Sequence, residues 1–254
     1  MAVETPTVSY VLSNNESQKI SEDIRKKVIQ VSQLLGYTKN FHANALSSGK
    51  SNLIGVYLGY SDFSLSNSEA LKYLLEITKV FKENNYDIIF LPLDLEKTIN
   101  YCDAIICILL SDEEYELVCK NNYIPVIALD SNAKDPWNFE IISTFGNIKD
   151  FISTDDYTLV LYKPKSDYIA SLIEKNNNGK VFFINSVTEI DALSSISSRT
   201  LVTPYNNLFA FLKNKVPNII KYRIDTTNKI NTLLKCTKLA IDHVEVDKHK
   251  YIID

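Results

Sequence analysis

Acidic, aromatic and amide side chains stand directly after several apolar runs of this sequence. They are Tyr60, Asp62 and Phe63 after the first run, Asp112 and Asp130 after two later runs, and Tyr205 and Asn206 late in the chain. Aromatic faces beside a few hydrogen-bond acceptors suit a polar small molecule. Polar residues also end strands in proteins that bind nothing there, so a single position carries little weight. The set as a whole predicts a binding site for a polar small molecule.

The sequence gives poor support for catalysis. The three histidines are His42, His243 and His249, and none adjoins a nucleophile elbow. Motifs of the G-x-S-x-G, H-E-x-x-H and Walker types are missing from the sequence. The run 48–51 ends like a P-loop, but it lacks the motif's first glycine and a preceding strand, so we interpret it as a linker. Carboxylates at 94–96 and 112–114 are more typical of helix caps than of a metal site. We expect no enzyme activity, no cofactor and no bound metal.

The composition is that of a globular protein with reduced cysteines. A chain of 254 residues with 45% hydrophobic content is long enough for one to three domains with a proper core. Cys102, Cys107, Cys119 and Cys236 show no C-x-x-C spacing, so we interpret them as core thiols. The sequence has no charged-then-apolar leader and no apolar run that approaches about 18 residues. These features predict a cytoplasmic location and no membrane contact.

The predicted ligand residues need a scaffold that brings strand ends together, and the order of apolar segments provides one. Apolar runs at 53–58, 88–91, 104–110 and 125–129 alternate with helical segments. A second round has strands at 158–162, 181–184, 201–202 and 219–224, with helices at 187–196, 205–213 and 229–239 among them. Strand-helix-strand repeats are typical of parallel sheets with right-handed crossovers. We therefore predict an α/β protein of two lobes, each a parallel sheet flanked by helices, with ligand residues at the carboxyl ends of the strands.

The first fifty residues differ from the rest. Thr5 and Pro6 are typical of a helix start, and the helix that follows turns a small, polar and aromatic face outward. A second helix is predicted from Ser21 to Gly36. Two small helices packed across a turn are the arrangement by which a helix-turn-helix unit presents a recognition helix to DNA. Residues 1–50 hold six basic and four acidic side chains. The excess of positive charge suits binding to DNA, but it is too small to be evidence by itself.

Four motif blocks follow one another in this part of the chain. They are Thr7-Val8-Ser9-x-Val11-Leu12, the run 25–28 with Leu35-Gly36-Tyr37, Asn40-x-x-Ala43-x-x-Leu46, and Ser51-x-x-Ile54-Gly55-Val56. In this order and spacing they resemble the recognition helix, third helix, hinge and sensor-core entry of the LacI family of bacterial transcriptional regulators. The resemblance implies a periplasmic-binding-protein-like core whose two lobes clamp a small-molecule effector, such as a sugar or a related metabolite. It also implies a homodimer bound to double-stranded operator DNA.

The resemblance assigns roles to residues of the first helix. Thr5, Pro6 and Tyr10 match positions that face base edges, and Thr7 and Ser9 match positions that contact phosphate. Phosphate contacts position the helix, whereas base contacts select the sequence. A tyrosine at position 10 offers one hydroxyl and a ring for a thymine methyl, where many members carry arginine, so the preferred half-site should differ from theirs.

The hinge is expected to contact DNA as well. Asn40 resembles the residue that begins the hinge helix and approaches the DNA backbone, and Ala43 lies within that helix. Leu46 resembles a wedge that enters the minor groove and unstacks a base step. The alternative for Leu46 is a leucine that packs the link against the core.

The resemblance divides the chain into three parts. They are a partial helix-turn-helix head at 1–40, a hinge helix and linker at 41–51, and a two-lobed effector-binding and dimerisation domain at 52–254. The family's first helix precedes the recognition helix, whereas Met1 stands almost at the turn here, so we expect that helix to be absent from this chain. Tyr205 and Asn206 stand where the family often has an Asp, so specificity for sugars is not implied. We predict a DNA-binding transcriptional regulator, with repression as the expected mode. The alternative is a ligand-sensing or dimerising module that has lost autonomous DNA binding.

Overall fold

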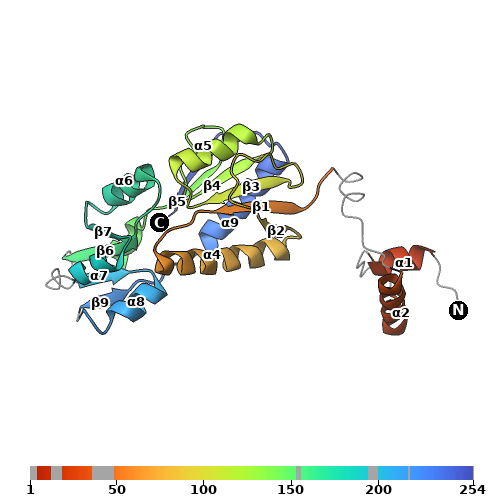
Figure 1. Ribbon diagram of the computed structural model, residues 1–254, viewed down its shortest axis with the longest axis horizontal. Coiled ribbons are helices and arrows are strands. Elements are labelled where there is room, and N and C mark those ends of the chain that lie inside the picture. The colour runs from red at the N-terminus through yellow and green to blue at the C-terminus, as the bar shows by residue number, and fades with distance from the viewer. Residues whose placement is uncertain are drawn as a thin grey trace. The chain divides into compact units, whose positions relative to one another are not determined.

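The computed structural model describes residues 5–12, 19–35, 49–152, 156–193, 200–216 and 218–253. The chain divides into two compact units, Met1–Ser51 and Asn52–Asp254 (Figure 1). No helix among the described residues is both long enough and apolar enough to cross a membrane.

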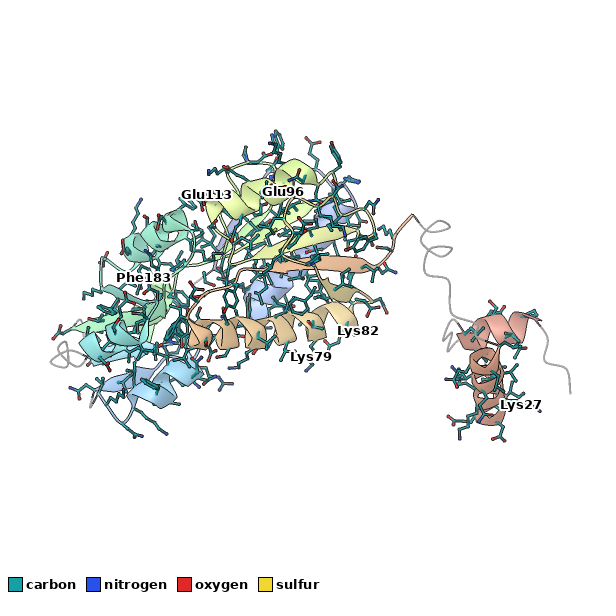
Figure 2. The ribbon with its side chains drawn as sticks, viewed as in Figure 1. Lys27, Lys79, Lys82, Glu96, Glu113 and Phe183 are labelled. Carbon is teal, nitrogen blue, oxygen red and sulfur yellow. The ribbon has the colours of Figure 1, made fainter. Side chains whose placement is uncertain are left out.

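The first unit contains a pair of helices in contact with each other, α1 (Thr5–Leu12) and α2 (Glu22–Leu34). Val11 of α1 and Val28 of α2 are buried. Val31 and Leu35 follow Val28 at helical spacing and would continue its apolar stripe, but both are exposed. Lys27 projects from α2 into solvent (Figure 2).

The second unit begins with an all-parallel sheet of six strands in the order β10-β5-β4-β3-β1-β2. The strands are β1 (Leu53–Leu58), β2 (Asp87–Phe90), β3 (Ala104–Ile108), β4 (Val126–Leu129), β5 (Glu140–Ser143) and β10 (Lys250–Ile253). Strands β1, β3 and β4 are continuous apolar runs because both faces of the sheet are covered.

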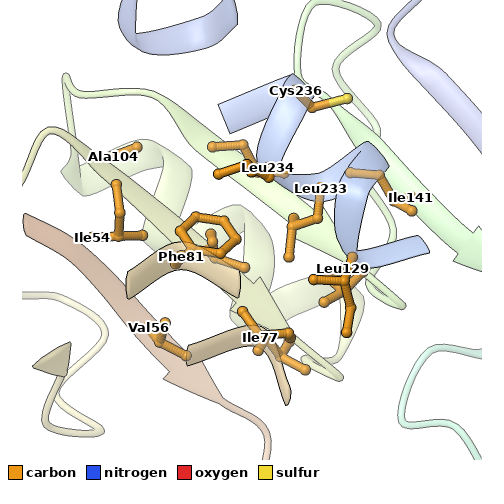
Figure 3. Packing of buried hydrophobic residues seen from close by; sticks show 14 of the residues in the cluster. Ile54, Val56, Ile77, Phe81, Ala104, Leu129, Ile141, Leu233, Leu234 and Cys236 are labelled. Atoms are coloured by element: carbon orange, nitrogen blue, oxygen red, sulfur yellow. The ribbon is translucent and has the colours of Figure 1, made fainter. Parts of the chain in front are cut away.

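Alternate residues of these strands enter two separate cores. On one face, α4 (Ser64–Glu83) and α9 (Thr227–Ile241) place Phe81 and Leu233 among inward-facing residues such as Ile54 and Leu129 (Figure 3). On the other face, α5 (Asp112–Asn121) packs against the intervening residues, such as Cys107. The period of two along each strand produces this division.

A second parallel sheet has four strands in the order β7-β6-β8-β9. The strands are β6 (Tyr157–Tyr162), β7 (Val181–Ile184), β8 (Thr200–Thr203) and β9 (Ile219–Lys221). Helices α7 (Val187–Ala192) and α8 (Asn206–Leu212) cover one face, and α6 (Asp167–Asn176) covers the other. Phe63, which precedes α4, is buried in the core of this second lobe.

The chain crosses between the lobes twice, after β5 and after β9. The first crossing contains the short 3-10 helix η1 (Gly146–Asp150). The Tyr222 hydroxyl of the second crossing donates a hydrogen bond to Oδ1 of Asn147 in the first. Because α9 and β10 return to the first sheet, that lobe is built from two separate parts of the sequence.

The two α/β lobes and their order of strands and helices confirm the predicted fold class. Two strands were not predicted, β5 and β10, which pair with each other. The helix expected at 187–196 ends at Ala192, and the strand expected at 219–224 ends at Lys221. After Lys221 the chain leaves the second sheet to reach α9, so pairing with β8 stops at that residue.

Candidate ligand-binding site

The carboxyl ends of strands from both lobes open onto one cleft. Its volume is about 1040 Å³, at the upper end of the roughly 300–1,000 Å³ range of small-molecule sites. Residues that follow β1, β3, β4 and β5 line it from the first lobe, and residues that follow β6, β8 and β9 line it from the second. One face of α4 and the start of α9 complete the wall. This is where ligands bind in open α/β sheets.

A buried ion pair forms part of this wall. Nζ of Lys229, in the first turn of α9, contacts Oδ2 of Asp130, which follows β4. Only 7% of the lysine side chain and 17% of the aspartate side chain are exposed. The other aspartate oxygen accepts a hydrogen bond from the backbone N–H of Ser143, at 2.9 Å. Asp130 adopts a left-handed backbone conformation with φ of 48°, which aspartate tolerates better than most residues. The carboxylate is therefore both neutralised and held in place.

Tyr73 of α4 lies beside this pair. Nζ of Lys229 stands 5.1 Å from the centre of the tyrosine ring, a distance suited to a cation–π contact. The Tyr73 hydroxyl is buried and has no hydrogen-bond partner among the described residues. Burial raises the pKa of this hydroxyl well above its usual value, with smaller contributions from Asp130 and Glu76. The hydroxyl therefore keeps its proton and is an unused donor in the cleft wall.

Two further tyrosines form an aromatic surface on the second lobe. The rings of Tyr162 and Tyr205 stack with their centres 4.5 Å apart and their planes 23° from parallel. Burial is the main cause of the raised pKa of both hydroxyls. Neutral, stacked rings of this kind offer an apolar face to a ligand.

Asn207, in the first turn of α8, joins this surface to α4. Its side-chain oxygen accepts a hydrogen bond from the Tyr162 hydroxyl at 2.7 Å. Its side-chain nitrogen donates to the carbonyl oxygen of Leu65 at 2.6 Å and to Oγ of Ser68 at 2.7 Å. Its backbone N–H donates to Oε1 of Glu69 at 3.1 Å. One amide side chain thus links the two lobes at the rim of the cleft.

The cleft contains three of the residues predicted to bind a ligand, Asp130, Tyr205 and Asn206. Each follows a strand, as the topological argument required. Asp130 and Tyr205 have buried or half-buried side chains, and Asn206 is exposed at the start of α8.

The other four residues lie outside the cleft lining. Tyr60 is exposed and Asp62 is exposed beside it. Phe63 is buried in the second lobe, where its ring meets Tyr162 edge to face at 5.6 Å. Asp112 begins α5 and accepts a hydrogen bond from the side chain of Asn132 at 2.9 Å. Their predicted contact with a ligand stays a prediction.

The residues predicted to contact DNA are only partly described. Pro6, Ser9 and Tyr10 are exposed on α1, and Thr7 is half-buried. Thr5 is the first residue of α1, and its side chain lies outside the described part of the chain. The outward face expected for this helix is thus open to solvent.

The hinge residues Asn40, Ala43 and Leu46 also lie outside the described residues. Gly49 and Lys50, which follow the hinge, are exposed. The DNA-contact roles of all these residues remain predictions.

Sequence reasoning missed Lys229, Tyr73 and Asn207. Lys229 and Tyr73 lie on helices rather than after strands, and only the packing of α9 against α4 brings them to Asp130. Asn207 directly follows a predicted site residue, so its place could have been inferred. Arg223, beyond β9, also lines the cleft, and the strand predicted through 224 concealed it. No group of three metal-binding side chains occurs within the described ranges.

Comparison with known proteins gives a short sequence match and several long structural ones. No protein-family model matches the sequence. A segment is 48% identical over 56 residues to the HTH-type transcriptional regulator YkvZ of Bacillus subtilis (strain 168). The match covers 22% of this chain and 17% of that regulator, so most of the relative's length has no counterpart in the match.

Two solved regulators resemble almost the whole chain in structure. The lac repressor dimer bound to operator and the anti-inducer ONPF matches with a TM-score of 0.58 and 13% identity. The match covers 99% of this chain and 92% of the repressor. The transcriptional regulator CelR in complex with cellobiose matches with a TM-score of 0.57 and 9% identity, over 99% and 93% of the two chains. These matches confirm that the chain has the fold of the LacI-family transcriptional regulators.

Proposed function

We propose that this protein is a LacI-type transcriptional regulator of the repressor kind. In this proposal a homodimer binds double-stranded operator DNA in the cytoplasm and responds to a small molecule between its lobes. The observation that carries the proposal is the cleft of about 1040 Å³ with its buried Asp130–Lys229 pair, in a chain that matches the lac repressor over 99% of its length. The sequence match to an HTH-type regulator supports a DNA-binding role.

The proposal assigns a role to each part of the chain. Residues 1–40 act as a helix-turn-helix head, 41–51 as hinge and linker, and 52–254 as the effector-binding and dimerisation domain. Pro6 and Tyr10, with Thr5, read base edges, while Thr7 and Ser9 contact phosphate. Asn40 begins the hinge helix and approaches the DNA backbone, Ala43 lies within that helix, and Leu46 enters the minor groove as a wedge.

Regulation follows from differential binding. An effector that prefers one arrangement of the lobes shifts the population toward it, and DNA affinity changes by the same coupling free energy. Of the two regulators matched, one is bound to an anti-inducer and the other to cellobiose. A small polar metabolite in the cleft is therefore the proposed effector.

A selection of genomic fragments by the full chain, followed by gel-shift titration, tests the proposal. We expect sequence-selective binding that weakens steeply with salt, because phosphate contacts release counterions. Tyr10→Ala should relax sequence preference, while Gln30→Ala, an exposed change on α2, should leave binding intact. Failure to enrich any sequence over bulk DNA would reject a regulator that acts alone.

One observation favours the alternative, a ligand-sensing or dimerising module that has lost autonomous DNA binding. Ile29, Val31 and Leu34 of α2 and its C-cap residue Leu35 are all exposed, with Leu34 86% exposed. A helix that leaves so much apolar surface open suits a head completed by another protein. In that case the same selection gives enrichment only when an intact relative is added.

A further inference from the structure

The acidic groups of the cleft already have partners. Asp130 is paired with Lys229 and accepts from Ser143. Glu69 accepts a hydrogen bond from the backbone of Asn207, and Glu76 accepts one from the Thr226 hydroxyl at 2.7 Å. These three carboxylates are therefore engaged within the protein, and Asp225 and Glu83 are the other acidic residues that line the cleft.

Asp225 and Glu83 also have neighbours within the protein. Asp225 accepts a hydrogen bond from the backbone N–H of Thr227, and that residue is the main cause of its lowered pKa, with a smaller contribution from Arg223. Glu83 is the last residue of α4, one helical turn beyond Lys79, which also lines the cleft. The acidic groups that line the cleft are thus hydrogen-bonded or lie one helical turn from a basic residue.

Basic groups, by contrast, remain unpaired at one edge. Lys163 follows β6, Lys221 ends β9, and Arg223 lies two residues further on. All three line the cleft and are exposed to it, and none forms an ion pair with a residue in the described part of the chain. We call these three residues the basic edge.

The sheet topology brings the basic edge together. Strands β6, β8 and β9 are parallel neighbours, and Thr203 of β8 is in register with Lys221 of β9. Arg223 lies two residues beyond the last paired residue of β9, and Lys163 follows Tyr162, the last residue of β6. The three cations therefore lie at or just beyond the carboxyl ends of β6 and β9, where these strands meet the cleft.

We propose that the effector of this cleft is a small organic anion whose acidic group binds at the basic edge. The inference rests on the proposed function of the cleft as an effector site. Cations that line one edge of a cleft without forming an ion pair favour a phosphate or carboxylate, and arginine can bind either with two hydrogen bonds. Lys72 and Lys79 of α4 also line the cleft, but they alternate along the helix with Glu69, Glu76 and Glu83, so the excess of positive charge is confined to the basic edge (Figure 2 shows Lys79).

The neutral end of the anion faces the opposite wall. There the unpartnered Tyr73 hydroxyl offers a donor, and the Asp130–Lys229 pair offers fixed charges of both signs. A buried donor without a partner is unfavourable, so a ligand acceptor that satisfies it gains affinity. A ligand with an acidic group at one end and a hydroxyl or carbonyl at the other fits both walls.

Thermal unfolding and calorimetric titration with defined anions test the inference. The probes are inorganic phosphate, glucose 6-phosphate and gluconate, each matched in ionic strength with chloride, and glucose is the neutral probe. The phosphate and carboxylate arms distinguish the two sources of negative charge. We expect at least one anion to raise the unfolding temperature in a saturable way, as binding to the native state requires, and glucose to have no such effect.

A pair of double variants with the same change in net charge locates the binding. Lys163→Gln/Arg223→Gln should weaken the anion's affinity at least about 10-fold, since each charged hydrogen bond contributes about 1.5–3 kcal/mol. The control Lys175→Gln/Lys213→Gln changes two exposed lysines of the same lobe outside the cleft and should bind like the wild type.

Three results would overturn the inference: no saturable anion binding, a response to glucose alone, or equal affinity in both double variants. Operator binding in the absence of any probe keeps the proposed function separate. A chain that binds operator but no anion disproves the inference only. A chain that binds anions at the basic edge but never DNA disproves the regulator.

Discussion

The ammonium group of Lys229 lies in the wall of the cleft beside Asp130, and both side chains are largely shielded from water. Removing one member of such a pair leaves the other as an uncompensated buried charge. We expect Lys229→Met to lower the free energy of unfolding by about 3 kcal/mol or more. Urea denaturation measures the decrease.

The double variant Lys229→Met/Asp130→Asn is the control for this effect. Asparagine tolerates the left-handed backbone at this position and still accepts the hydrogen bond from Ser143. Most of the stability should therefore return. If the double variant is as unstable as Lys229→Met, packing of the lysine stem rather than its charge holds the wall together.

Burial raises the pKa of the cysteine thiols, which gives the protein a dependence on alkaline pH. Burial is the main cause that raises the pKa of Cys102 and of Cys236 from 9.0 to about 12. Above pH 9 these thiols ionise in the unfolded chain but keep their protons in the folded protein, so the free energy of unfolding falls as pH rises toward 12. Below pH 9 the thiols are protonated in both states and do not affect stability. The fall should approach about 1.4 kcal/mol per pH unit for each thiol.

Cys236→Ala isolates one of these contributions. Its unfolding free energy should decline less steeply between pH 9 and 11 than that of the wild type. Leu234→Ala, a buried neighbour on α9 without a thiol, should be less stable at every pH but keep the wild-type slope. Equal slopes in wild type and Cys236→Ala would mean that this thiol ionises as readily in the folded state as in the unfolded one.

The site residues separate into those that sequence can locate and those that it cannot. Asp130 and Tyr205 were found because any residue that follows a parallel strand reaches the same edge of the sheet. Tyr73 and Lys229 are 156 positions apart in the sequence, and neither the helix spacing nor the residue type indicates that they meet. Their proximity depends on how α4 and α9 pack on one face of the first sheet.

At the level of elements, the strands that were predicted differ from those that were missed in one respect. Strands β1, β3 and β4 are uninterrupted apolar runs. Strands β5 and β10 each begin with a charged residue, Glu140 and Lys250, which reads as the end of a strand or a loop. In the sheet Glu140 and Lys250 are register partners and form an ion pair at 2.6 Å, so each compensates the charge of the other. A single strand read alone cannot show that compensation.

The end of β1 is the element most sensitive to added volume. A Cβ at Gly59 would lie 2.0 Å from the carbonyl oxygen of Leu109, which belongs to the backbone that follows β3. We expect Gly59→Ala to cost about 3 kcal/mol of stability, because backbone must move to accommodate it. Chemical denaturation measures this decrease.

Gly179→Ala is the matched comparison. An added Cβ there meets nothing within 4 Å, and the only penalty is the φ of 69°. That conformation costs about 1–2 kcal/mol for a residue with a side chain. A Gly59→Ala variant no less stable than Gly179→Ala would show that the ends of β1 and β3 can separate freely.

At the scale of the second unit, polar contacts join the two lobes in two regions, one near α4 and α8 and the other near α5 and α6. Near α4 and α8, Asn207 forms the hydrogen bonds that join the second lobe to the first. Near α5 and α6, Lys165 pairs with Glu114, and Lys250 of β10 contacts the Tyr168 hydroxyl. The two chain crossings provide the covalent links. A rearrangement of the lobes must therefore break polar contacts near both helix pairs.

Asn207 is the residue whose substitution should change the arrangement of the lobes most. Asn207→Ala removes the hydrogen bonds of one amide side chain to Tyr162, Leu65 and Ser68, at a cost of about 2 kcal/mol in stability. With only the contacts near α5 and α6 left, the lobes should open on the side of α4 and α8, and small-angle scattering should report a larger radius of gyration. The exposed change Asn214→Ala should leave both quantities unchanged.

Because coupling is reciprocal, an effector that draws the lobes together must bind Asn207→Ala more weakly and restore its compact profile at saturation. An unaltered scattering profile together with the expected decrease in stability would place the hinge between the lobes elsewhere, at the Tyr222–Asn147 hydrogen bond of the two crossings.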